Sequence, residues 1–207
     1  MVNRKMFTRV SVGLAAAAVA ALTVLAPQAS AAQAGTTQGN TTQGNTTQAA
    51  SARQAAVQQA LKVTPNVADS GCTGRALPLD CWVHEPIVTQ PSATYPTIQF
   101  LPGDHVTVDA GGCVQTGGHG ATWKRYVNPA SDNGLYHGLI NIPGGTAGTQ
   151  QIWTAVGRTF TVGGSGGSLV LGYEDDGYSD NGYYSHDDGT GNQCKGVGNA
   201  WVHIVIS

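Results

Sequence analysis

Half of the acidic residues of this chain fall in one short segment. Residues 172–192 contain six of the twelve Asp and Glu residues, and they contain no Lys or Arg. Crowding carboxylates into one loop costs self-repulsion unless something positive offsets it. The glycines of the segment allow sharp turns, so side-chain and carbonyl oxygens can converge. Oxygen ligands, six to eight at about 2.3–2.6 Å, are what Ca²⁺ requires. The segment therefore predicts a calcium site, with a solvated hairpin loop as the alternative. The six residues are Glu174, Asp175, Asp176, Asp180, Asp187 and Asp188.

Catalytic motifs are weaker than this acidic signal. Residues 163–167 match the G-x-S-x-G pattern, but a nucleophile elbow needs a helix after it. Here a second strand is expected, so the segment predicts a hairpin turn. An EF-hand does not fit either, because counting from Asp176 puts glycine at position 7 instead of 6. A glycoside hydrolase needs two carboxylates at a defined separation, which the acidic segment could supply. We expect a protein without catalytic residues and keep glycoside hydrolase as an alternative.

The N-terminal region predicts export. Residues 1–31 combine a basic start, an apolar stretch and a small-residue cleavage site, which is typical of a secretory signal peptide. No other segment approaches membrane-spanning length, so we expect a secreted, extracellular protein. Removing three basic residues changes the formal net charge from −2 to −5. A mildly acidic protein is a poor candidate for nucleic-acid binding, which depends on Lys and Arg. A homo-oligomer is compatible with this composition.

Four cysteines in an exported chain indicate disulfides. They are Cys72, Cys81, Cys113 and Cys194, and they allow three pairings. We favour Cys72–Cys81 as a local bridge and Cys113–Cys194 as a long one, which would stabilise the chain by about 4 kcal/mol. Zinc is the other use of cysteines, but the chain has no Cys-x₂-Cys pair.

The remaining chain divides into a spacer and a β-domain. Residues 32–66 are of low complexity, with a repeated Thr-Thr-Gln-Gly-Asn unit, and predict a disordered spacer. Within it, residues 51–62 favour a short helix. Residues 67–207 contain alternating segments at 105–109, 168–173 and 201–206, typical of half-buried strands. Short strands separated by Gly-rich turns predict a single all-β domain, a jelly-roll-like β-sandwich.

Residues 97–207 also resemble a known family, the bacterial calcium-dependent galactophilic lectins of the PA-I type. The matching motifs are a strand, Pro-Gly-Asp turn and strand over 98–108, an Asp-Asn-Gly-Leu segment over 132–135 and the acidic loop over 173–182. The resemblance implies a jelly-roll-like β-sandwich that binds Ca²⁺ and, through it, a carbohydrate.

The resemblance also implies which residues form the site. Asp175 or Asp176 takes the place of the family's calcium Asp, and Asp180 with Asn181 takes the place of its Asn-Asn pair. Tyr178 and Thr116 mark the backbone carbonyls that complete the metal site. The sugar site would comprise Asp132, Asn133 and the calcium-bound Asp175, Asp176 and Asp180.

Three departures from the family concern the sugar. Ala130 stands where the family has a sugar-binding His, the calcium loop is about two residues shorter, and residues 185–195 are an insertion. The resemblance therefore implies weak galactose binding or another preferred sugar.

Aromatic faces could stack on a sugar. The candidates, which could equally be ordinary strand residues, are Trp123, Tyr178, Tyr183 and Tyr184.

Together these features predict a secreted calcium-dependent carbohydrate-binding protein. The alternative is a secreted β-sandwich whose calcium is purely structural and whose partner is a protein or the cell envelope.

Overall fold

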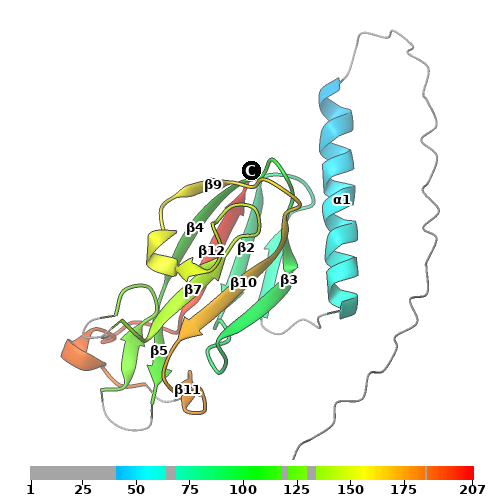
Figure 1. Cartoon of the computed structure of the whole chain (residues 1–207). Coiled ribbons are helices and arrows are strands. Elements are labelled where there is room, and N and C mark those ends of the chain that lie inside the picture. The colour runs from blue at the N-terminus through cyan, green and yellow to red at the C-terminus, as the bar shows by residue number, and fades with distance from the viewer. Residues whose placement is uncertain (1–40, 64–68, 118–120, 130–133, 185) are drawn as a thin grey trace, which may run out of the picture. The chain divides into compact units, whose positions relative to one another are not determined.

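The structure of this 207-residue chain is a computed structural model that describes residues 41–63, 69–117, 121–129, 134–184 and 186–207 (Figure 1). The helices are α1 Thr41–Val63 and two short 3-10 helices, η1 Ile152–Thr154 and η2 Thr190–Asn192. The strands are β1 Asp69–Thr73, β2 Leu79–His84, β3 Ser92–Phe100, β4 His105–Gly111, β5 Cys113–Thr116, β6 Trp123–Arg125, β7 His137–Asn141, β8 Gln150–Gln151, β9 Thr159–Thr161, β10 Gly167–Glu174, β11 Asn181–Gly182 and β12 Trp201–Ile206.

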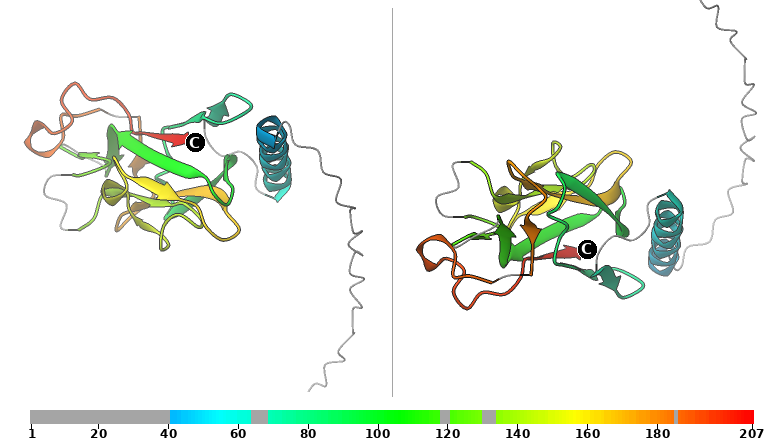
Figure 2. Two further views of the ribbon diagram at one scale, coloured as in Figure 1. Left: turned by 90° about the horizontal axis from the view of Figure 1, so that it is seen from above. Right: turned by 90° about the horizontal axis from the view of Figure 1, so that it is seen from below.

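The strands form three sheets. The orders are β1-β2-β12-β4-β9, β3-β10-β7-β8 and β11-β5-β6, and neighbouring strands within each sheet are antiparallel. Figure 2 shows the same strands from two further directions. The prediction of an all-β domain is confirmed, and the alternating segments at 105–109, 168–173 and 201–206 lie in β4, β10 and β12.

The core draws on both larger sheets. On β12, every second residue is buried, so Val202, Ile204 and Ile206 point inward. They share one apolar cluster with Leu169 and Leu171 of β10. Each such side chain stabilises the fold by about 1.5–3 kcal/mol, which is why the period-2 pattern fixes the inward face of these strands.

The turn over residues 163–167 is not the expected hairpin. It follows β9, which pairs with β4, and leads into β10, which pairs with β3 and β7. The segment therefore crosses from one sheet to another. Gly166 has φ +65°, and a Cβ there would come 2.2 Å from the carbonyl oxygen of Phe100. Alternation identifies a strand but not its partner, and this is why the hairpin prediction was wrong.

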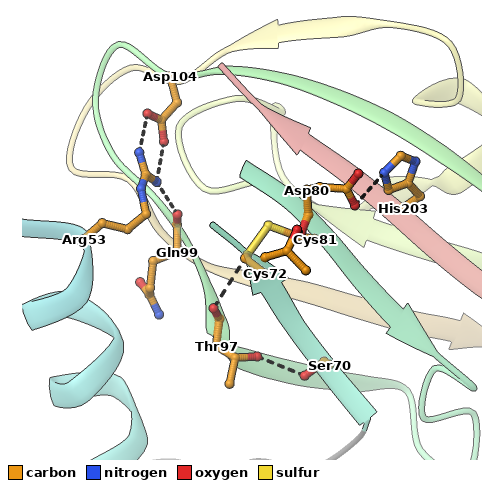
Figure 3. The surroundings of a disulfide bond; sticks show 10 residues. Arg53, Ser70, Cys72, Asp80, Cys81, Thr97, Gln99, Asp104 and His203 are labelled. Atoms are coloured by element: carbon orange, nitrogen blue, oxygen red, sulfur yellow. Dashed lines mark hydrogen bonds and ion pairs between the residues drawn. A yellow bond between two sulfur atoms is a disulfide. The ribbon is translucent and has the colours of Figure 1, made fainter. Parts of the chain in front are cut away.

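Helix α1 is longer than predicted. It covers Thr41–Val63 instead of 51–62 and includes part of the repeat expected as disordered spacer. Arg53, only 8% exposed, holds it to the β-domain (Figure 3). Its guanidinium donates to both carboxylate oxygens of Asp104, at 2.9 and 2.7 Å, and to the carbonyl of Gln99 at 2.6 Å. Charge-assisted bidentate pairs are strong, and such tertiary contacts stabilise a helix of modest propensity. Residues 1–31, 32–40 and 64–66 of the predicted signal peptide and spacer lie outside the described residues.

Both favoured disulfides are confirmed. Cys72–Cys81 joins directly opposed residues of β1 and β2 (Figure 3), and Cys113–Cys194 joins β5 to the segment after η2. Two disulfides fit an oxidising compartment. In the part of the chain that the structure describes, no helix has the length and apolar character needed to cross a membrane.

The buried tyrosines predict alkaline unfolding. Burial raises the pKa of Tyr95 to about 12, although a hydrogen bond from the N–H of Ile87 lowers it in part. Burial also raises the pKa values of Tyr126, Tyr173 and Tyr183. Because the folded pKa lies above the unfolded value, this stability is complete below about pH 10 and is lost as pH rises through 12; for Tyr95 it amounts to about 3 kcal/mol.

Tyrosinate absorbance and circular dichroism, followed from pH 9 to 13, test this. Ionisation of the buried tyrosines should coincide with unfolding. Tyr184 is 70% exposed, so the control Tyr184→Phe should leave the midpoint unchanged. Titration of all tyrosines near their ordinary pKa in a folded protein would contradict the prediction.

Candidate functional site

The acidic loop connects β10 to β11 at one end of the β-domain (Figure 1). It begins at Asp175, directly after β10, and ends at Asn181, the first residue of β11. In the pairing of β11 with β5, Asn181 lies opposite Thr116. The structure therefore brings together three residues of the expected metal site that are up to 65 positions apart in the sequence.

Two side-chain oxygens in this loop are buried without a hydrogen bond from any described residue. Asp175 accepts from the N–H of Gly177 through Oδ1 at 3.2 Å, but its Oδ2 has no partner. Asn181 is 3% exposed and donates through Nδ2 to the carbonyl of Val88 at 2.9 Å, but its Oδ1 also has no partner. Nearly all buried polar groups are hydrogen-bonded, and leaving one unsatisfied costs about 1–3 kcal/mol.

The charge of Asp175 is not compensated. Burial raises the pKa of its carboxyl group, and contacts with the Asn181 side chain and the Gly177 N–H oppose this only in part. Among the described residues, no Lys or Arg forms an ion pair with Asp175, Asp176 or Asp180. A desolvated carboxylate favours a cation close by, and none of these side chains supplies one.

The carboxylates do not converge as the sequence suggested. Within the described residues, no group of three or more His, Cys, Asp and Glu side chains is placed to hold a metal ion. Asp176 is exposed and accepts from the Tyr136 hydroxyl at 3.4 Å. The carboxylate of Asp180 faces the end of β5, with Oδ2 3.5 Å from where a Cβ of Gly117 would lie. Of the two candidates for the first calcium ligand, Asp175 contacts the Asn181 side chain, and Asp176 contacts Tyr136.

The two expected carbonyl donors have their hydroxyl groups engaged elsewhere. Thr116 donates through Oγ1 to the carbonyl of Thr122 at 2.7 Å. Tyr178 donates to the carbonyl of Tyr173 at 3.2 Å. The hydroxyl of each residue is thus engaged as a donor within the fold, and the backbone carbonyls stay the predicted metal ligands at these two positions.

Asp187 belongs to a different structure within the acidic segment. Its carboxylate accepts from the N–H groups of Thr122, Trp123 and Gly189 at 2.7–3.1 Å. Burial would raise the pKa of Asp187, but these hydrogen bonds hold it below its ordinary value. Asp187 thus ties the insertion to β6, and composition alone could not separate it from the loop acids.

Tyr136 is a site residue that the sequence did not reveal. It follows the segment expected to carry the sugar-binding Asp132 and Asn133, which lie outside the described residues. Its N–H donates to the carbonyl of Glu174 at 2.6 Å. Partial burial and then the nearby carboxylates of the loop, Asp176 first, raise its pKa. Tyr136 therefore brings the end of that segment to the acidic loop.

Of the four aromatic candidates, Tyr184 suits stacking on a sugar. It is 70% exposed, its ring lies across Gly182 and its hydroxyl donates to the carbonyl of Asp180 at 3.1 Å. Trp123 does not suit stacking, because it is fully buried and packs on His186 with 4.1 Å between ring centroids. Tyr183 is largely buried, with its hydroxyl donating to the carbonyl of Pro86.

No protein-family model, curated protein or solved structure matches this chain. The resemblance to the galactophilic lectins therefore stays a prediction based on motifs, and the functional argument depends on the geometry of the acidic loop.

Proposed function

We propose that this chain is a secreted, calcium-dependent carbohydrate-binding protein without catalytic activity, exported through a signal peptide at 1–31 and built on a jelly-roll-like β-sandwich. One observation carries the proposal. Asp175 Oδ2 and Asn181 Oδ1 are buried beside each other without hydrogen bonds from described residues. A hard divalent cation is the partner that suits a buried carboxylate oxygen next to a buried amide oxygen.

The loop offers further oxygens for the same ion. Asp180 closes the loop beside Asn181, Thr116 pairs with Asn181 in the neighbouring strand, and Tyr178 lies within the loop itself, so each could contribute an oxygen. Calcium accepts six to eight oxygens in a flexible geometry, so this mixed set is suitable without a third converging carboxylate. The ion would supply the positive charge that the loop lacks and would offer open positions to ligand oxygens.

A sugar fits the surroundings of this loop. Sugar hydroxyls can act as metal ligands, and carboxylates at the rim can accept hydrogen bonds from neighbouring hydroxyls. Tyr184 adds an exposed ring held in place by its hydrogen bond to the Asp180 carbonyl. Aromatic faces of this kind stack on the C–H face of a pyranose.

A glycan array probed with and without calcium tests the proposal. Binding should need calcium, and Tyr184→Ala should weaken it about two- to tenfold, the range of an aromatic contact. The matched control is Trp153→Ala, because Trp153 is 52% exposed but lies on η1; it should bind like the wild type. If calcium stabilises the protein but no glycan binds, the calcium is structural and the alternative of a protein or cell-envelope partner replaces this proposal.

A further inference from the structure

A second group of aromatic side chains lies on the outer face of the five-stranded sheet. Trp82 and His84 come from β2, and Trp201 and His203 come from β12, with Trp82 directly opposite His203 and His84 opposite Trp201. Trp82 stacks on His203 and His84, with centroids 4.2 and 5.5 Å apart, and its centroid is 5.6 Å from that of Trp201. These four rings, here called the aromatic face, are all partly or fully exposed.

Glycines beside the rings leave the aromatic face open. Three indole atoms of Trp201 lie 2.9–3.3 Å from where a Cβ of Gly111 would be, so the ring lies flat across β4 and turns its other face outward. On the opposite side Gly71 of β1 pairs with Trp82, and a Cβ there would meet nothing within 4 Å. A side chain at position 111 would therefore crowd the Trp201 ring, whereas the space beside Gly71 is open.

Carboxylates lie on both sides of the aromatic face. The strands β1, β2, β12 and β4 contain no Lys or Arg. Asp69 lies on β1 opposite His84, and Asp109 lies on β4 opposite His203. Across the sheet the two acids therefore stand three strand spacings apart, about 14 Å; they are also offset by two residues along the strands, on either side of the rings. A third acid, Asp80, already pairs with His203 at 3.1 Å (Figure 3). Asp109 accepts from the Ala110 N–H at 2.8 Å through Oδ1, so Asp69 and the other oxygen of Asp109 are offered to a ligand.

We propose that the aromatic face binds a positively charged oligosaccharide built from glucosamine-type amino sugars, independently of calcium. A pyranose ring would stack on the Trp201 indole, beside the Trp82 ring that already stacks on His84 and His203. Protonated amino groups would pair with Asp69 and Asp109. This binding differs from calcium-dependent recognition at the acidic loop, because that loop joins β10 to β11 in the other sheets.

A basic peptide is the competing ligand, and the topology disfavours it. Extended peptides bind by adding a strand to an open sheet edge. The aromatic rings, however, lie on β2 and β12, each of which is already paired on both sides. A ligand here must lie across the strands and make its contacts through ring faces and carboxylates, which suits a short oligosaccharide.

Calorimetric titration of the full chain in EGTA tests this inference, with the glucosamine trimer, its N-acetylated counterpart and an arginine-rich peptide as probes. Because EGTA removes calcium, any binding measured in it does not depend on the proposed calcium site, so the two proposals can fail separately. The glucosamine trimer should bind best, and Trp201→Ala should weaken its binding about tenfold. Trp153→Ala removes a more exposed indole, on η1, and should leave this binding unchanged.

A charge variant keeps the test independent of folding defects. Asp69 and Asp109 are exposed, so Asp69→Asn with Asp109→Asn should leave the melting curve unchanged. The double variant should lower the affinity for the glucosamine trimer about three- to tenfold, and it should remove the salt dependence of this binding. Equal binding of the N-acetylated trimer, preference for the peptide, an equal loss in Trp153→Ala or no saturable binding would each overturn the proposal.

Discussion

Calcium should raise the melting temperature of the full chain by roughly 5–10 °C relative to EGTA. An ion that binds only the folded state at 100 times its Kd adds about 2.7 kcal/mol, and 1 kcal/mol shifts the melting temperature by about 2–4 °C in a domain of this size. The physical reason is that the ion neutralises the loop carboxylates and meets the unpartnered oxygens of Asp175 and Asn181. Differential scanning calorimetry in both buffers measures the shift.

Asp175→Asn should raise the melting temperature of the protein in EGTA. The substitution keeps the Oδ1 acceptor for the Gly177 N–H and removes a charge whose burial is not compensated. Without calcium the variant should therefore melt above the wild type, and calcium should no longer shift it. Asp176→Asn is the matched control, because Asp176 is exposed and points to Tyr136; it should retain most of the shift. Identical wild-type melting curves in calcium and EGTA would eliminate the calcium site.

The long disulfide should contribute more stability than the short one. Cys113 and Cys194 are 81 positions apart, whereas Cys72 and Cys81 are 9 apart. Loop-closure entropy in the unfolded chain gives about 4.5 kcal/mol for the first and about 2.7 kcal/mol for the second. Urea unfolding of the two double alanine variants measures both losses.

The two variants should also differ at the acidic loop. Cys113 begins β5, and the other end of that short strand, Thr116, pairs with Asn181. Removing the long bridge should therefore reduce the calcium-dependent shift, and removing the short one should not. Equal losses of unfolding free energy in the two variants would contradict this prediction. They would show that local packing around each disulfide, and not the entropy of the unfolded chain, sets its contribution to stability.

The sequence by itself determined the all-β class, both disulfides and the place of the acidic loop. The strands β4, β10 and β12 follow from alternation, because one face of each is buried in a shared core and the other is not. The bridges follow from an even number of cysteines, which form one close pair and one distant pair. Strand periodicity is a local property of each segment, and four cysteines allow only three pairings. Neither prediction therefore required knowledge of which strands pair.

Only the tertiary structure decided what the individual side chains do. Composition placed Asp187 with Asp175, but backbone N–H groups of Thr122 and Trp123, at the start of β6, give Asp187 a structural role. Trp123 was a candidate for stacking on a sugar, and packing on His186 buries it. The aromatic face joins Trp82 to Trp201, 119 positions apart in the sequence. In each case the deciding contact is a long-range pairing, and such pairings depend on how strands from distant segments align, which alternation within one segment does not encode.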